Sequence, residues 1–167
     1  MAGALIVTAE IAPLDFSWLQ GLRRAHYPPD RNQVPAHLTM FRAIAPSIEG
    51  ELRSRLARIV RQPVPEARIA GLIDLGGGVA FRIVSPDLDR IREELARELH
   101  GLLSAQDSGG WVPHVTIQNK VAPKIARALR QSFESSFEPR SLRISGLSIH
   151  RYLGGPWEPV AGYSFRP

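Results

Sequence analysis

The sequence contains no cysteine among its 167 residues. This absence excludes disulfide bonds, thiolate catalysis and cysteine-bound zinc. Long apolar runs are missing too, because none approaches the roughly 18 residues that a membrane-spanning helix needs. The opening segment MAGALIVTAE lacks the basic region of a secretory signal, and Glu10 interrupts its apolar run. We therefore expect a soluble, cytoplasmic protein.

Lysine is scarce, and no run of basic residues occurs. Lys120 and Lys124 are the two lysines, and all other members of the 21 basic residues are arginine. The formal net charge is +5, which allows an anionic partner such as a nucleic acid or a phosphate ester. Because the arginines are spread over both halves of the chain, a generic arginine-rich surface is the alternative interpretation.

Strand and helix patterns alternate in the first half of the chain. Residues 5–9 (LIVTA) predict a buried strand, and Phe16, Leu19 and Leu22 recur at helical spacing. Three prolines in residues 27–35 predict a loop. The elements expected after this loop are a strand over 37–44, a helix capped by Ser47 with Ile48, Leu52, Leu56 and Ile59 or Val60 on its apolar face, and a hairpin of 68–76 and 79–85.

The second half repeats this order. Ser85 and Pro86 predict the start of another helix, and QDSGGWVP predicts another loop. The elements expected beyond it are a strand over 114–121, a helix after Pro123 with Ile125, Leu129 and Phe133 on one face, an extended run over 142–150, and a last extended piece near Tyr163. Opposite side-chain phases on the two sides of Ser145 and Gly146 predict a β-bulge there.

The repeated order predicts an α+β fold formed by one duplicated domain. The two repeats span about residues 1–76 and 77–167, and equivalent motifs in them lie 77 residues apart. Antiparallel hairpins mixed with helices predict two antiparallel sheets with helices outside them. We therefore expect two similar lobes that face one another across a central cleft, related by a pseudo-two-fold axis, with strands that could be exchanged between the lobes.

Two segments place a threonine two residues after a histidine. They are PAHLTMFRA at 35–43 and WVPHVTIQN at 111–119, in a chain that has only three threonines. Residues i and i+2 of a strand project from the same face, about 6.6 Å apart. His37 and Thr39 should therefore point together, as should His114 and Thr116, and the two pairs should converge if the lobes face one another.

Such a set of side chains suits the cleavage of a phosphodiester. The unperturbed pKa of histidine lies near 6.5, so at neutral pH one imidazole can accept a proton while the other supplies one. Threonine hydroxyls can donate hydrogen bonds to phosphate oxygens as charge builds in the transition state. This chemistry requires no metal.

The two segments resemble a known signature. AHLTM at 36–40 and PHVTI at 113–117 fit the hydrophobic-His-x-Thr-hydrophobic motif of the two-histidine phosphoesterase superfamily, and the whole chain is similar to its 2'-5' RNA ligase-like, RNA cyclic phosphodiesterase branch. The resemblance implies one lobe made from both chain ends and one from the middle. It also implies His37 and His114 as the acid–base pair, Thr39 and Thr116 as phosphate ligands, no metal and no cofactor.

The implied substrates are 2',3'-cyclic phosphates at RNA ends or on small nucleotides, and 2'-5' linkages in RNA. Hydrolysis and 2'-5' ligation both stay open, as does the choice of acid and base. We expect a monomer. Phe41 could line the pocket or belong to the core, and Arg42 and Lys120 could contact phosphate or solvent. Asn119 departs from the family pattern because many relatives carry arginine there.

Two other functions remain as alternatives. Because residue 119 is asparagine where many relatives carry arginine, the first alternative is a catalytically weak or inactive binding module for RNA or nucleotides. The second alternative is a metal hydrolase that uses the same histidines. His26, His100 and His150 lack a companion threonine and are expected at the surface or half-buried. The glycines at 76–78 predict a hairpin turn because no helix follows them directly.

Overall fold

One long strand, β6 (Arg140–Tyr152), belongs to two sheets of this computed structural model, which describes residues 3–167. From Ile144 onward, β6 pairs with β1 (Leu5–Ile11), and β7 (Trp157–Ser164) lies along its other edge. The first residues of β6 pair instead with β3 (Glu66–Asp74). The strand order β2-β1-β6-β3-β4-β5 is completed by β2 (Leu38–Ile44), β4 (Val79–Val84) and β5 (His114–Gln118), and every pairing is antiparallel.

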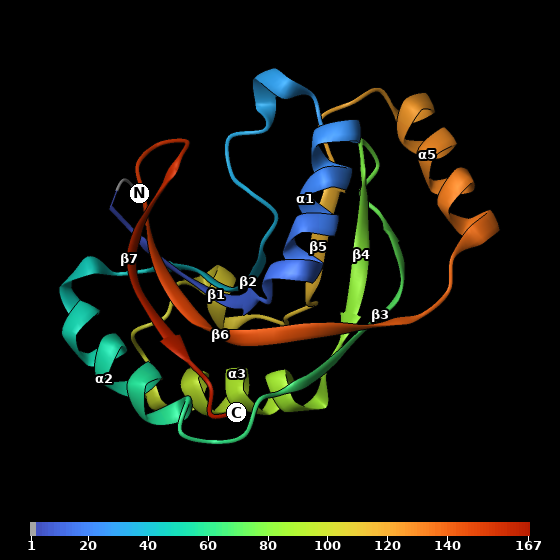
Figure 1. Cartoon of the computed structure of the whole chain (residues 1–167). Helices are drawn as coiled ribbons and strands as arrows, with labels where there is room; N and C mark the ends of the chain where they lie inside the picture. Colours follow the sequence, from blue (N-terminus) through green and yellow to red (C-terminus); the bar gives the residue numbers. More distant parts are fainter. Residues whose placement is uncertain (1–2) are drawn as a thin grey trace.

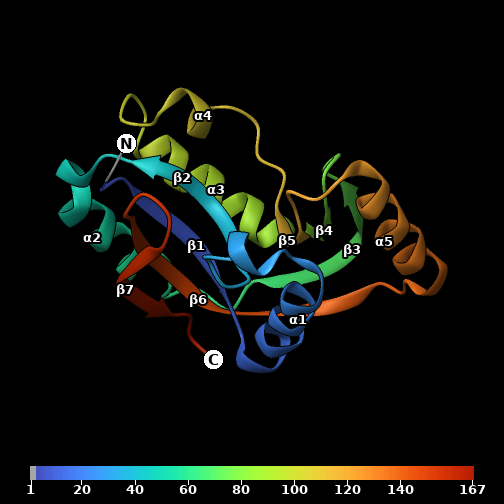
Figure 2. The same cartoon turned by 90° about the horizontal axis from the view of Figure 1, so that it is seen from above.

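Helices lie around the two sheets. In Figures 1 and 2, α2 and α5 lie at opposite ends of the molecule, and α1 runs alongside β5. The helices are α1 (Pro13–His26), α2 (Glu49–Ile59), α3 (Pro86–Glu98), α4 (Ala105–Ser108) and α5 (Pro123–Ser136), with 3-10 turns at Pro29–Arg31 and Pro46–Ile48. Within residues 3–167, no helix is long and apolar enough to cross a membrane. The predicted α+β class with two antiparallel sheets is confirmed.

The two halves of the chain exchange strands. β3 precedes β4 in the chain and pairs with it in the second sheet, whereas β6 and β7, from the end of the chain, complete the sheet that β1 and β2 begin. Each half therefore supplies backbone hydrogen bonds to the sheet of the other half. The boundaries of the two sequence repeats remain a prediction.

The predicted bulge in β6 is confirmed. Glu10 pairs with Gly146 and Ile11 with Ile144, which leaves Ser145 as the extra residue. A Cβ on Gly146 would lie 2.2 Å from the carbonyl oxygen of Tyr163 in β7, so only glycine allows this close approach. A bulge bends and twists a strand. The bend falls where β6 passes from one sheet to the other.

Of the two serine caps predicted at helix starts, one is confirmed and the other is wrong. Ser85 caps α3 as expected, since its hydroxyl oxygen accepts a hydrogen bond from the Leu88 backbone N–H at 3.1 Å. Ser47 does not cap α2, because a 3-10 turn occupies Pro46–Ile48 and α2 begins at Glu49 without a side-chain cap. Part of the loop expected over 106–113 is also helical, because Ser104 caps the short helix α4.

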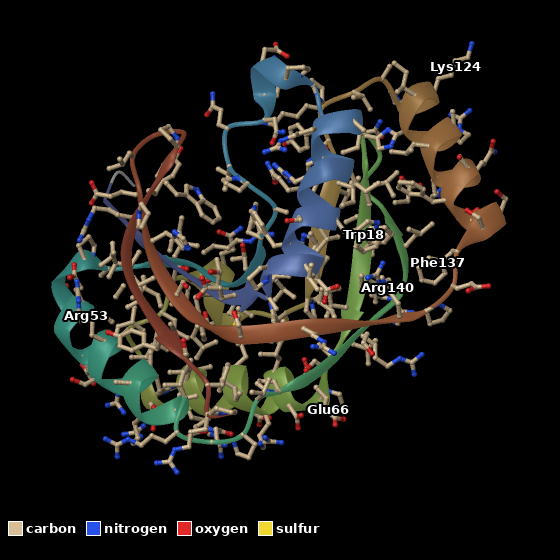
Figure 3. All side chains as sticks on the ribbon, in the orientation of Figure 1. Trp18, Arg53, Glu66, Lys124, Phe137 and Arg140 are labelled. Atoms are coloured by element: carbon tan, nitrogen blue, oxygen red, sulfur yellow. The ribbon has the colours of Figure 1, made fainter. Side chains whose placement is uncertain are left out.

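Aromatic rings attach α1 to the second sheet. The Trp18 ring stacks on Phe81 of β4 with centroids 5.5 Å apart, and Phe133 of α5 lies 5.8 Å beyond Phe81. The Arg140 guanidinium lies 4.0 Å from the Trp18 centroid, and Figure 3 shows these two side chains close together near Phe137. Stacked rings and a cation over a ring each stabilise such a contact by about 1 kcal/mol. As a result, a helix from the first half packs against strands of the second.

Candidate functional site

The two motif strands expose their histidine–threonine pairs to one cleft. Both strands lie at sheet edges and contact one another. The alternate residues of each strand are almost fully buried in the core: Leu38, Met40, Val115 and Ile117. The cleft has a volume of about 670 Å³ and is lined by His37, Thr39, His114 and Thr116. The structure thus brings together the four side chains that the sequence singles out.

Each imidazole is oriented by a backbone carbonyl two residues earlier. His37 Nδ1 lies 2.8 Å from the Pro35 carbonyl oxygen, and His114 Nδ1 lies 2.8 Å from that of Val112. Because a carbonyl only accepts, Nδ1 carries the proton in both rings. This leaves Nε2 of each ring for the cleft, so the two motifs orient their imidazoles in the same way.

His37 lies in the more enclosed environment. Its ring packs against Trp157 of β7 with centroids 4.6 Å apart. Burial lowers the pKa of His37 to about 4, although the hydrogen bond to Pro35 opposes this effect, and the charges of Arg23, His114 and His150 lower the pKa further. His37 is therefore neutral at physiological pH and able to accept a proton.

The low pKa of His37 predicts a loss of stability in acid. An unfolded histidine titrates near pH 6.5, so between pH 6.5 and about 4 the unfolded chain binds a proton that the folded protein does not. The free energy of unfolding should fall across this window. His37→Gln should remove roughly 1–3 kcal/mol of that fall, measured by urea unfolding at pH 7.5, 5.5 and 4.5. Parallel pH curves for the two proteins would contradict the assignment.

The carbonyl groups of both motif threonines accept hydrogen bonds from the opposite half of the chain. Trp111 Nε1 donates to the Thr39 carbonyl at 3.0 Å, and Arg23 Nη1 donates to the Thr116 carbonyl at 2.8 Å. An edge strand has unpaired backbone groups that need such partners. These bonds hold β2 and β5 at a fixed position relative to one another. Sequence reasoning missed Arg23 as part of the site, because nothing in the pattern of α1 marks it.

Asp107 and Arg92 form hydrogen bonds with further backbone groups on the exposed edge of β2. The Asp107 carboxylate, which is buried, accepts hydrogen bonds from the backbone N–H groups of Arg42 and Ala43 at 2.7 and 2.8 Å. Arg92 Nε donates to the Met40 carbonyl at 3.2 Å. The short helix α4, which the sequence did not predict, thus positions the strand that begins directly after His37 and carries Thr39.

The other pocket candidates separate into three groups. Arg42 and Asn119 line the cleft. Phe41 belongs to the core instead, since it is fully buried and Arg92 lies 4.6 Å from its ring centroid. Lys120 does not line the cleft but an adjoining hollow. The register between β1 and β2 shifts between Thr39 and Phe41, which takes Phe41 out of the alternation and into the core rather than the pocket.

The remaining histidines lie outside the cleft. His100 is exposed, and His26 contacts Phe133 edge to face. His150 is half-buried, with Nε2 3.4 Å from the Thr8 hydroxyl, and it lines a separate apolar pocket together with Trp157. Within the described part of the chain, no group of three or more His, Asp or Glu side chains is placed to hold a metal ion.

A bilobal α+β fold with one His-x-Thr pair from each half in a shared cleft defines the two-histidine phosphoesterases. A sequence model of the 2'-5' RNA ligase superfamily matches residues 11–156, so the chain belongs to this family of ligase-like phosphoesterases. The curated proteins contain no match to the chain.

Solved structures share the whole fold at low identity. TT0787 of Thermus thermophilus superposes with a TM-score of 0.66 at 15% identity, covering 98% of both chains. Escherichia coli LigT in its apo form gives 0.61 at 15% identity, covering 99% of this chain and 98% of that one. LigT with 3'-AMP gives 0.56 at 16% identity, with the same coverage. These similarities support the fold.

Proposed function

We propose that the protein is a metal-independent 2',3'-cyclic phosphodiesterase acting on RNA ends or small nucleotides. The observation that carries this proposal is the pair of imidazoles in one cleft, each with Nδ1 bonded to a carbonyl and each beside a threonine. This arrangement can remove one proton and supply another at a single phosphorus atom. Crystal structures of E. coli LigT with phosphate and with 3'-AMP support a phosphate ligand in this fold.

In the proposed mechanism, His37 is the base and His114 is the acid. The neutral Nε2 of His37 accepts a proton from water, and the water oxygen forms a bond to phosphorus. The bond from phosphorus to one ribose oxygen breaks, and this oxygen receives the proton that His114 carries. The hydroxyl groups of Thr39 and Thr116 donate hydrogen bonds to the non-bridging oxygens as their negative charge increases.

The same residues allow a second reaction of the cyclic phosphate. When the 5'-hydroxyl of another RNA end replaces water, its proton passes to His37 and its oxygen bonds to phosphorus. The bond from phosphorus to the 3' oxygen breaks, that oxygen receives the proton of His114, and a 2'-5' linkage remains. The acid and base requirements are unchanged, so ligation of two RNA ends is a second activity to be measured with the same protein.

Turnover of a 2',3'-cyclic mononucleotide tests the proposed function. We expect formation of the nucleoside monophosphate, measured by chromatography, at a rate that EDTA does not change. Because kcat/KM reports the free enzyme and His37 must be neutral, activity should fall on the acid side only as the pH approaches about 4. Activity that disappears with EDTA and returns with zinc would instead identify a metal hydrolase.

Asn119 favours the second candidate, an inactive or weakly active binding module. Its amide is neutral, so it supplies no positive charge to the cleft, and its oxygen accepts a hydrogen bond from the Lys120 backbone N–H at 2.9 Å. Tight binding of a 3'-nucleotide without turnover of any cyclic substrate would select this candidate over the enzyme.

A further inference from the structure

A second hollow with several positive charges adjoins the cleft. It has a volume of about 390 Å³ and shares His37, Thr116, Asn119 and Tyr152 with the cleft. Its own walls include Arg23, Tyr27, Arg31 and Lys120, and we call it the cationic hollow. Because His37 lines both spaces, a ligand in the cleft can continue directly into the cationic hollow.

The charge of the cationic hollow is not neutralised from within. Among its described lining residues, three are cationic and none is acidic. Within residues 3–167, Arg23 and Lys120 form no ion pair with an acidic side chain. Arg31 lies 3.8 Å from Asp30, but both side chains are largely exposed, so this pair contributes little. An anion in the hollow would meet three charges of the opposite sign.

Arg23 is the buried cation among the three that line the hollow. The residue is 3% exposed, and its Nη atoms donate to the carbonyls of Thr116 and Val34 and to the Asn32 side chain. Its buried Nε has no hydrogen-bond partner in the described structure. Burying a charge without an opposite charge is costly, and burial accordingly lowers the pKa of Arg23. A bound anion would offset that cost.

Lys120 adopts a backbone conformation that is uncommon for its residue type. Its φ of 62° lies in the left-handed region, where residues other than glycine are rare. Such strain often accompanies a functional position. The hydrogen bond from its N–H to Asn119 holds this conformation, so the residue that departs from the family pattern helps to place a lysine on the hollow.

We infer that the cationic hollow binds the next phosphodiester group of an RNA strand whose terminal phosphate occupies the cleft. This inference rests on the proposed function and makes a single-stranded oligonucleotide end, rather than a free mononucleotide, the preferred substrate. Arginine and lysine contact phosphate oxygens along single strands, and aromatic rings stack on the bases. Tyr27 and Tyr152 line the hollow and offer such rings.

Binding of two product-like ligands tests the inference without requiring turnover. The ligands are a nucleoside 3'-phosphate and a trinucleotide that ends in a 3'-phosphate, titrated by calorimetry at fixed salt. Wild-type protein should bind the trinucleotide more tightly. Arg31→Ala and Lys120→Ala should each weaken trinucleotide binding by roughly five- to tenfold, with a change below about twofold for the mononucleotide.

Arg24→Ala is the matched control, because Arg24 is exposed on α1 and lines neither the cleft nor the hollow. It removes the same charge and should leave both affinities unchanged. Equal losses on both ligands, no loss on the trinucleotide, or an equal effect of Arg24→Ala would overturn the inference. Failure of the phosphodiesterase proposal would appear separately, as absence of turnover by a wild-type protein that still distinguishes the two ligands.

Discussion

Replacing His37 or His114 by alanine is expected to lower kcat for a 2',3'-cyclic nucleotide by about a thousandfold, because each variant loses one proton transfer. His37→Ala should also remove the acid limb of the pH profile, and His114→Ala the alkaline limb. Initial rates measured across pH 3.5–9, at substrate concentrations above KM, provide both readouts. The two effects should not add in the double variant, since both imidazoles act in one step.

The exposed His100 provides the control for this experiment. His100→Ala removes an imidazole outside the cleft and should preserve both the rate and the shape of the profile. A His37 or His114 variant that keeps full activity would remove that histidine from the mechanism. A large loss of rate with both limbs intact would show that the residue acts on folding or binding instead, which a thermal melt of the variant would reveal.

Replacing Thr39 or Thr116 by valine is expected to lower kcat by about a hundredfold. Valine keeps the shape and the β-branch of threonine but removes the hydroxyl that donates to a phosphate oxygen, and loss of one such donor costs about two to three orders of magnitude. KM should change less than kcat, because the charge on the oxygen increases in the transition state. Steady-state kinetics of both variants measure kcat and KM separately.

Serine at the same positions should restore most of the rate, since it keeps the donor. Thr8 is the third threonine of the chain, and it is buried beside His150 rather than in the cleft, so Thr8→Val is the matched control. If valine variants at 39 and 116 matched wild type, the hydroxyls would have no role in stabilising the transition state.

Much of the fold could be predicted because local patterns agree with tertiary packing. Strict alternation around His37 and His114 assigned the correct residues to the core, and that assignment oriented both pairs toward the cleft. The bulge at Ser145 followed from the same two-residue periodicity. In each case the signal depends on neighbours in the chain, which a single sequence contains.

Contacts between distant residues could not be predicted. The hydrogen bonds from Arg23 and Trp111 to the motif strands join residues 93 and 72 positions apart. The failed cap at Ser47 has a local cause, because Pro46 begins a 3-10 turn before α2. Phe41 was ambiguous because regular alternation places residue 41 on the same face as Thr39. A register shift between β1 and β2 at this point, which a single sequence does not reveal, puts Phe41 in the core beside Arg92.

The exchange of strands between the two sheets ties the two halves of the protein together. Because β3 and β6 each bond to partners contributed by the other half, neither half is an independent body that could swing on a hinge. The span between the two imidazoles is therefore set by continuous backbone ladders. The segments 27–36 and 153–156 lie outside these ladders and line the cationic hollow, so for the proposed reaction they are the parts of the site that the ladders do not hold.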